Sequence, residues 1–299
     1  MSAASPARPA RFGIGFFRAF CRSPLATLGL VLTLGIVLAA ICAPLLAAQD
    51  PYDLMQIDFM DGRMAPGTQS MTGFTFHLGS DDQGRDLLSA ILYGLRISLF
   101  VGLGSAALAF VIGTVFGLFA AYVGGRTETL MMRIVDLQLS FPTILCALLI
   151  LALLGKSLTN VVLAIVIVEW ATYARTARSS ALTQMRREYV EAARLLQMPH
   201  RHIVFRQLLP NCLPPLMVLL TIQVARAITL EATLSFLGLG VPVTEPSLGL
   251  LIANGFEFLL SGVYWISLFP GITLVVTIFA INLVGDRLRQ MLDPRGAQR

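Results

Sequence analysis

Six long apolar runs constrain the fold of this chain more than any other feature of its sequence. A run of about 20 apolar residues has the length that crosses the hydrocarbon core of a bilayer as an α-helix. The whole chain is 56% hydrophobic and 13% charged, far from the composition of soluble proteins. We therefore predict an all-α integral membrane protein with six transmembrane helices, over residues 25–48, 97–123, 134–155, 158–176, 212–235 and 265–285.

The first run and a further, shorter apolar stretch each need a separate interpretation. The run 25–48 is longer than the roughly 7–15 apolar residues of a secretory signal peptide, so we expect a retained membrane anchor. The stretch 247–262 is shorter and contains Asn254, Gly255 and Glu257, so we expect it to be re-entrant or interfacial.

The positions of the arginines predict the orientation of the chain. Cytoplasmic loops of membrane proteins carry most of the positive charge. If both termini are cytoplasmic, the segments on that side hold 17 arginines, and the opposite side holds only Arg63, Arg85, Lys156 and the borderline Arg96. The net charge of +5 is then explained by the topology, and nucleic acid binding is not needed to explain it.

The apolar runs and the charges together divide the chain into five parts. We predict a cytoplasmic N-terminal tail, a first transmembrane helix, a periplasmic or extracellular loop, a membrane domain of five helices and a cytoplasmic C-terminal tail, over residues 1–24, 25–48, 49–95, 96–285 and 286–299. The outer loop is acidic, with seven aspartates between Asp50 and Asp86.

Catalytic and metal-binding patterns are missing from the sequence. Gly155-Lys156-Ser157 resembles the end of a phosphate-binding loop, but that pattern needs a glycine where Ile150 stands. His200 and His202 diverge on a helix and have no acidic or cysteine partner nearby, and the four cysteines form no CxxC pair. We expect a non-catalytic chain that binds no metal or cofactor of its own.

Small residues recur every four positions along the second run. Such a stripe lets two helix backbones approach closely within lipid. We favour packing within the chain over a subunit interface for these residues, which are Ser105, Ala109, Gly113, Gly117, Ala121 and Gly125.

Three charged residues lie deep within the predicted spans. Charges are costly in a membrane and usually face a partner or water, which makes Glu169, Arg226 and Glu231 candidates for a translocation path. Each could equally form a structural pair or extend its side chain toward the interface.

The segment 186–210 is polar and basic although it lies between two apolar spans. Its residues 186–197 have helix-forming composition, and Pro199 favours a sharp turn followed by a second short helix that ends at Leu209-Pro210. The segment suits docking into a groove of a soluble protein or lying on anionic lipid, and composition leaves both open. Its first helix has a less polar face formed by Tyr189, Ala192, Ala193 and Leu196.

Motifs along most of the chain resemble those of a known transporter family. The segment EYVEAARLLQ, followed by LLP, resembles the EAA loop of ABC importer permeases. The resemblance covers about residues 25–295 and is closest to dipeptide/oligopeptide permeases of the DppC/OppC type. The matching stretches are HLGSDDQGRDLLSAILYGLRISL (77–99), MMRIVDLQLSFPTILCALLI (131–150), WATYARTARSSAL (170–182), EATLSFLGLGVPVTEPSLGLLI (231–252) and NLVGDRLRQMLDPR (282–295).

The resemblance implies a type-1 ABC importer permease fold in the bacterial cytoplasmic (inner) membrane. The chain would pair with a DppB/OppB-like subunit, dock on two cytoplasmic ATPase subunits that bind ATP and Mg²⁺, and receive solute from an extracytoplasmic binding protein. ATP-driven alternating access would then import di- or oligopeptides. The alternatives are import of nickel or another small solute on the same scaffold, or a self-contained carrier or channel, which should show inverted repeats; none is visible.

The resemblance also implies which residues couple the chain to its ATPases. The predicted coupling residues are Glu191, Ala192, Ala193, Gln197, Met198, Pro199 and His200. The family usually has glycine where Gln197 stands, and glycine tolerates the positive φ that strains glutamine. We therefore expect the turn to depart locally from that of its relatives, with Pro199 redirecting more of the chain.

Overall fold

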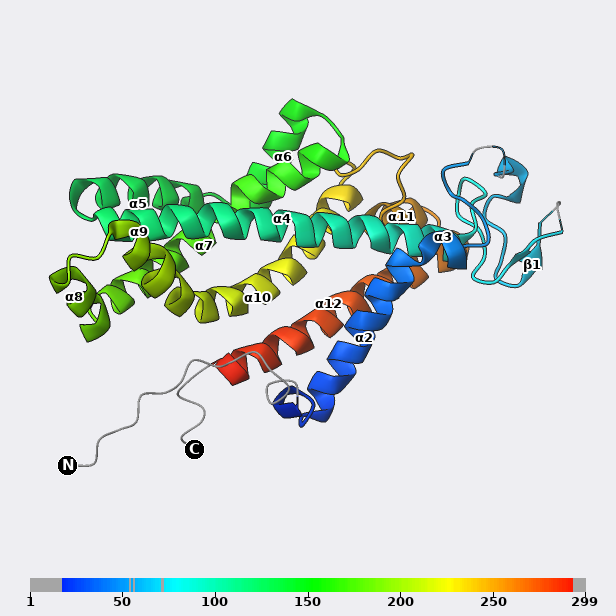
Figure 1. The fold of residues 1–299 in the computed structure, drawn as a ribbon. Helices are drawn as coiled ribbons and strands as arrows, with labels where there is room; N and C mark the ends of the chain where they lie inside the picture. The colour runs from blue at the N-terminus through cyan, green and yellow to red at the C-terminus, as the bar shows by residue number, and fades with distance from the viewer. Residues whose placement is uncertain (1–17, 54, 56, 71–72, 293–299) are drawn as a thin grey trace.

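Long helices make up most of the computed structural model, which describes residues 18–53, 55, 57–70 and 73–292 (Figure 1). Much of the two predicted tails, 1–17 and 293–299, lies outside the described residues. Within the described part, five helices are long and apolar enough to cross a membrane: α2 (Pro24–Ile41), α4 (Leu87–Val123), α7 (Leu158–Met185), α10 (Leu209–Phe236) and α12 (Trp265–Leu292).

Shorter elements connect these helices. The helical ones are α3 (Ala43–Leu46), α5 (Gly125–Ser140), α6 (Thr143–Leu154), α8 (Glu188–Leu195), α9 (His200–His202), α11 (Leu248–Phe256), a π-helix (Ile203–Leu208) and two 3-10 turns (Phe59–Asp61 and Leu259–Ser261). Strands β1 (Thr68–Gln69) and β2 (Thr75–Phe76) pair antiparallel, with Thr68 opposite Phe76. The short helix α11 and the 3-10 turn after it occupy the stretch 247–262, as expected of a segment too short to span.

The third predicted span, 134–155, is broken in the structure. Helices α5 and α6 meet at an angle of 89°, so the count of six spans holds only if this bent pair is taken as one. The break falls at Phe141-Pro142, because proline disfavours helical geometry in the residue before it. Helix α6 alone has 12 residues, or about 18 Å of helix, which is shorter than the hydrocarbon core.

Helix α5 is amphipathic and lies along the other helices instead of continuing the span. Two ion pairs join it to α7: Asp136 Oδ1 lies 2.7 Å from Arg175 Nη2, and Glu128 Oε1 lies 2.6 Å from Arg178 Nη2. Both pairs are at least partly exposed, so the buried contact of Val135 with Ala171 and Ala174 of α7 contributes more to holding α5 in place.

Helices α4, α7, α10 and α12 are longer than their apolar runs, whereas α2 ends at Ile41 and is shorter than the run 25–48. Helix α4 begins at Leu87, ten residues before the predicted span, so residues 87–95 belong to this helix and not to the outer loop. Its 37 residues span about 55 Å, against a hydrocarbon core of about 30 Å. The residues that lengthen α4 lie at the end that carries the outer loop, whereas the polar residues that lengthen α7 lie at the end that carries α8 and α9 (Figure 1).

The small-residue stripe of α4 packs against α7, the helix with which α4 makes its most extensive contact. A Cβ atom at Gly113 would lie 2.3 Å from the Trp170 carbonyl oxygen, and one at Gly117 would lie 2.2 Å from that of Ala174. No side chain fits at such distances. The stripe thus serves packing within the chain, as favoured from the sequence, although Gly125 falls outside the contact and begins α5.

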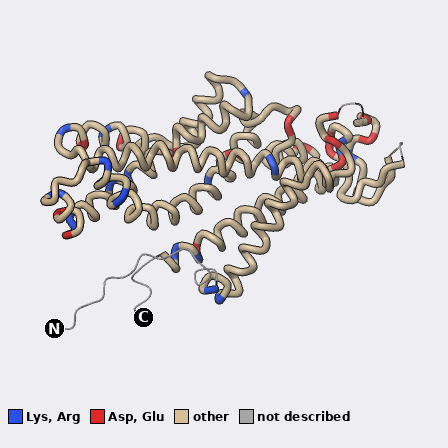
Figure 2. Tube along the Cα trace, viewed as in Figure 1, with Lys and Arg blue, Asp and Glu red and all other residues tan. Residues whose placement is uncertain are grey.

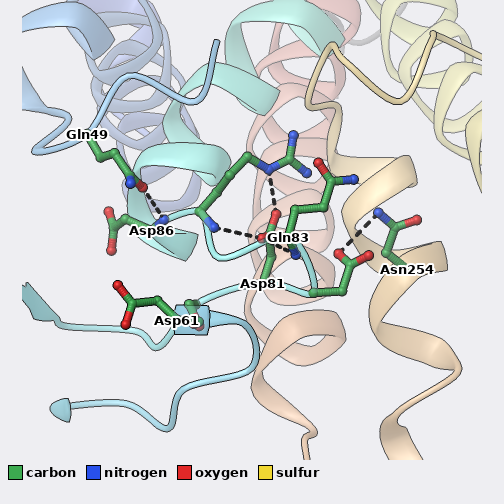
Figure 3. Close-up of polar contacts among 9 residues, drawn as sticks. Gln49, Asp61, Asp81, Gln83, Asp86 and Asn254 are labelled. Carbon is green, nitrogen blue, oxygen red and sulfur yellow. Dashed lines mark hydrogen bonds and ion pairs between the residues drawn. The ribbon is translucent and has the colours of Figure 1, made fainter. Parts of the chain in front are cut away.

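A network of hydrogen bonds fixes the outer loop to the start of α4 (Figure 3). The buried Asp81 accepts from Arg85 Nε at 2.6 Å and from the backbone N–H groups of Gln83 and Arg85, both at 2.9 Å. Asp86 caps α4 by accepting from Ser89 N at 2.8 Å, and its own N–H donates to Gln49 Oε1 at 2.6 Å. The loop is therefore a structured cap on the helices.

Charged side chains gather at opposite ends of the molecule. Figure 2 shows Asp and Glu concentrated around the β1–β2 loop, whereas Lys and Arg gather around α5, α8 and α9. A charge separation of this kind is the one expected when the α8–α9 end faces the cytoplasm.

Candidate functional site

The segment 186–210 forms a helix, a tight turn and a second helical stretch. Helix α8 ends at Leu195, the chain turns through Gln197 and Pro199, and α9 continues through the π-helix directly into α10. The expectation that the second helix ends at Leu209-Pro210 is therefore wrong. Proline lacks an N–H group and its ring crowds the carbonyl four residues earlier, so the wider π turn before Pro210 lets the helix continue.

The backbone turn after α8 has the geometry of a Schellman motif. The N–H of Gln197 donates to Arg194 O at 3.0 Å and that of Met198 donates to Ala193 O at 3.1 Å. Gln197 has φ 51°, in the left-handed region that favours glycine. This conformation is unfavourable for glutamine, and the two hydrogen bonds hold the residue in it. The expected departure from the turn of the relatives stays a prediction.

Replacement of Gln197 by glycine is expected to stabilise the protein. A non-glycine residue in the left-handed region costs about 1–2 kcal/mol, and the greater freedom of glycine in the unfolded chain offsets part of this. We expect a net gain of roughly 0.5–1 kcal/mol, measured as a higher unfolding temperature of the purified protein in detergent. Leu196→Gly is the matched control: Leu196 has φ −76°, so this variant should be less stable than the wild type.

The two halves of the segment pack on each other. Val190, Ala193, Ile203 and Leu208 are each at most 2% exposed and form one apolar cluster. The predicted less polar face of α8 is exposed at Tyr189, Ala192 and Leu196, as a docking face requires, but Ala193 is buried. The reason is that α8 packs on its own second half, a partner that helical spacing within α8 does not show.

The outward face of α8 is both acidic and apolar. Glu188, Glu191, Ala192 and Leu195 follow one another at helical spacing and are all exposed. Leu195 is 85% exposed, and the neighbouring Leu196 is 70% exposed. Large apolar side chains this exposed beside carboxylates are typical of a surface that another protein covers.

The turn itself contacts the end of α4. Tyr122 Oη and His200 Nδ1 are hydrogen-bonded, and the two rings meet edge to face at 5.7 Å between centroids. Met198 is partly buried and its sulfur accepts from Gln207 Nε2 at 3.7 Å, whereas Pro199 is exposed. Tyr122 was not among the residues expected to matter, because it lies at the end of the apolar run 97–123 and belongs to none of the motifs.

The three charged residues of the spans separate into two environments. Glu169 on α7 and Arg226 on α10 line the same pocket. Glu231 is fully buried elsewhere, and its two carboxylate oxygens accept from Ser98 Oγ and Ser235 Oγ, both at 2.8 Å. Glu231 therefore joins α4 to α10 in the helix core, which is the structural alternative considered for it.

Within the described residues, no group of three or more His, Cys, Asp or Glu side chains is placed to hold a metal ion. The four cysteines are free, and Cys212 is buried between helices. His200 bonds to Tyr122 as described, which gives it a structural contact.

Comparisons with known proteins agree with this architecture. Residues 113–297 match the family model of binding-protein-dependent transport system inner membrane components, and residues 12–66 match the N-terminal transmembrane domain of oligopeptide transport permease C. The methionine transporter MetNI, solved in inward-facing conformations, has a chain of the same fold: the TM-score is 0.57 at 20% identity, over 68% of this chain and 96% of that one.

Curated relatives match over nearly the whole chain. The di/tripeptide transport permease DppC of Pseudomonas aeruginosa is 38% identical over 94% of this chain and 91% of its own length. The oligopeptide transport permease OppC of Bacillus subtilis is 34% identical, over 92% of this chain and 87% of its own. The chain therefore belongs to the family of binding-protein-dependent transport system inner membrane components, the multi-pass permease subunits of ABC importers in the cytoplasmic membrane.

Proposed function

We propose that this chain is one half of a permease pair that imports di- and oligopeptides, and that residues 186–210 couple it to two cytoplasmic ATPase subunits. The names of the relatives support the substrate class. The observation that carries the coupling role is the outward face of α8, which presents Glu191, Ala192 and Leu195 at the end of the molecule. The second half would be a DppB/OppB-like chain.

The contacts of this segment suit the transmission of force. Helix α8 is fixed to the π-helix by the buried cluster around Val190 and Ala193, so the segment moves as one body. That body continues into α10 without a break and bonds to α4 through His200 and Tyr122. A displacement of α8 by closing ATPases would therefore shift α10, which carries Arg226 in the pocket between the spans.

Docking on a protein explains the outward face of α8 better than lying on lipid. Glu188 and Glu191 lie on that face beside the exposed Arg187 and Arg194, so the face carries both signs of charge, whereas attachment to anionic lipid favours a uniformly basic face. A groove on a soluble partner with complementary charge can accept the carboxylates together with Leu195.

The outer loop supplies a surface for a solute-binding protein. Met55, Phe59 and Met60 are 97%, 75% and 77% exposed on the loop that the Asp81 network holds in place. Exposed apolar side chains on a fixed scaffold are suited to contact with a protein partner. Such a partner would deliver solute at the end opposite to α8.

Uptake by a reconstituted importer tests the proposed function. This chain, a second permease subunit, the ATPase subunits and the binding protein encoded beside it are placed in proteoliposomes loaded with ATP. Labelled alanyl-alanine should accumulate only when ATP and the binding protein are both present. Accumulation of labelled nickel instead of peptide would refute the substrate class, and peptide uptake without the ATPase subunits would indicate a self-contained carrier.

A further inference from the structure

A pocket of about 420 Å³ lies between α6, α7, α10 and α12, within the membrane-spanning part of the chain. Its volume falls in the range of small-molecule sites, about 300–1,000 Å³. Its lining is apolar except for six side chains: Thr143, Glu169, Arg226, Thr229, Thr233 and Asn282. This polar content needs an explanation in a region where most side chains face lipid or other helices.

Glu169 is the most informative of these residues. Its side chain is 4% exposed, and its Oε2 atom has no hydrogen-bond partner. A carboxylate buried without a partner is costly in a membrane protein and marks a functional position. Arg226 is the other charged residue that lines this pocket.

Arg226 belongs to a polar strip on α10. Arg226, Thr229 and Thr233 are three and four residues apart, so they share one helix face, and Arg226 and Thr229 are exposed. Arg226 Nη1 bonds weakly to Gln223 Oε1 at 3.3 Å, which leaves other guanidinium N–H groups for a ligand. An exposed strip of this kind faces water and not lipid.

The bend between α5 and α6 brings a third group to the pocket. Thr143 and Ile144 line it, and they are the first two residues of α6, whose start has no side-chain cap. The free backbone N–H groups at a helix start attract anions. The pocket thus holds a cationic side chain and a helix start that suit a carboxylate, and an anionic side chain that suits an ammonium group.

We propose that Glu169 and Arg226 form a transient site for a peptide with free termini on its way through the permease. The Arg226 guanidinium and the start of α6 bind the peptide α-carboxylate, and the Glu169 carboxylate binds its α-ammonium group. The site recognises the two ends that all unmodified peptides share, so it needs no preference for side chains. This inference rests on the proposed function and specifies how this chain contacts its substrate.

Photo-cross-linking to the complete importer, with the binding protein omitted, tests this site directly. The probe is an alanyl dipeptide that carries a diazirine in its second side chain. Alanyl-alanine should compete with the probe at least about tenfold better than alanyl-alanine amide or N-acetyl-alanyl-alanine, because each capped peptide loses one charged hydrogen-bonding partner. Absence of cross-linking in the wild type would overturn the proposal.

Two variants separate the roles of the charged residues. Arg226→Gln should abolish the preference for a free carboxylate and keep that for a free amine, and Glu169→Gln should do the converse. Arg226→Lys keeps the positive charge, so it should keep the preference for a free carboxylate and the preference for a free amine. A merely structural role of Arg226 would not require either preference to depend on its charge. If Arg226→Gln still prefers the free carboxylate, the site is wrong.

Transport by the same preparations separates this inference from the proposed function. A wild-type importer that takes up no alanyl-alanine with its binding protein refutes the peptide substrate class. If the wild-type importer transports the peptide but both variants keep the wild-type preference for free ends, the site alone is refuted.

Discussion

Gly117→Leu is expected to prevent α4 and α7 from packing and to leave the chain without a stable fold. Even a methyl group at this position would lie 2.2 Å from the Ala174 carbonyl oxygen, far inside contact distance, and the atom it meets belongs to the backbone. The two helices would have to separate along their most extensive contact. Overpacking costs about 1–3 kcal/mol when side chains can adjust, and a backbone contact that cannot adjust costs more.

Labelling of Cys212 measures this packing directly. Cys212 is fully buried in a cluster with Leu118 of α4 and Ala177 of α7, next to Gly117. In a chain whose other three cysteines are replaced by serine, a thiol-reactive dye should label Cys212 slowly. In Gly117→Leu it should label Cys212 as fast as in denatured protein.

Gly104→Leu is the matched control for this prediction. Gly104 lies on the same helix, but a Cβ atom there would meet nothing within 4 Å. This variant should label at the wild-type rate. Equal and slow labelling of both variants would show that the α4–α7 contact is not as close as described.

Hydropathy and arginine placement predicted the membrane class and the approximate position of the long helices. These features are readable because the bilayer imposes length and composition on each span independently of its neighbours. The stripe around Gly113 was readable for a similar reason, since close helix packing in lipid requires small side chains at regular spacing. The family motifs then indicated residues 186–210 as the segment for which we propose a coupling role.

The features that were missed depend on contacts between distant segments. The bend at Phe141-Pro142 follows from a local residue preference, but α5 lies along α7 through the buried contact of Val135 and the ion pairs of Asp136 and Glu128, and no local pattern shows these contacts. The buried face of α8 is set by Ile203 of the same segment. The separation of Glu231 from the pocket likewise depends on Ser98, which is 133 residues away.

Gln197 shows that a local preference does not decide a backbone conformation by itself. Positive φ has a free-energy cost for glutamine. The two hydrogen bonds of the Schellman motif and the burial of Ala193 in the segment's cluster outweigh this cost. Tertiary packing thus decided the backbone conformation against the preference of the residue.

Glu191→Arg is expected to uncouple the permease from its ATPases while leaving it folded and inserted. Glu191 is exposed in the first turn of α8, where reversing the charge costs the helix only about 0.3–1 kcal/mol through its dipole. At a docked interface the same change leaves a charge facing its former partner, which costs several kcal/mol. The interface effect is larger, so uptake should fall more than tenfold while folding is retained.

Asp286→Arg is the control for this charge reversal. Asp286 is exposed on α12 at the end of that helix remote from the outer loop, and it lies outside residues 186–210. The same substitution there changes the net charge equally without touching the proposed docking face. Its transport activity should stay within twofold of the wild type, an estimate based on the small effect of exposed charges.

The most direct measurement records peptide uptake and ATP hydrolysis in the same proteoliposomes, with the loaded binding protein present. We predict that the wild type and Asp286→Arg show uptake and hydrolysis that the binding protein stimulates, whereas Glu191→Arg is inserted in equal amount and shows neither. Wild-type uptake and stimulated hydrolysis in Glu191→Arg would contradict the claim that the outward face of α8 couples this permease to ATP.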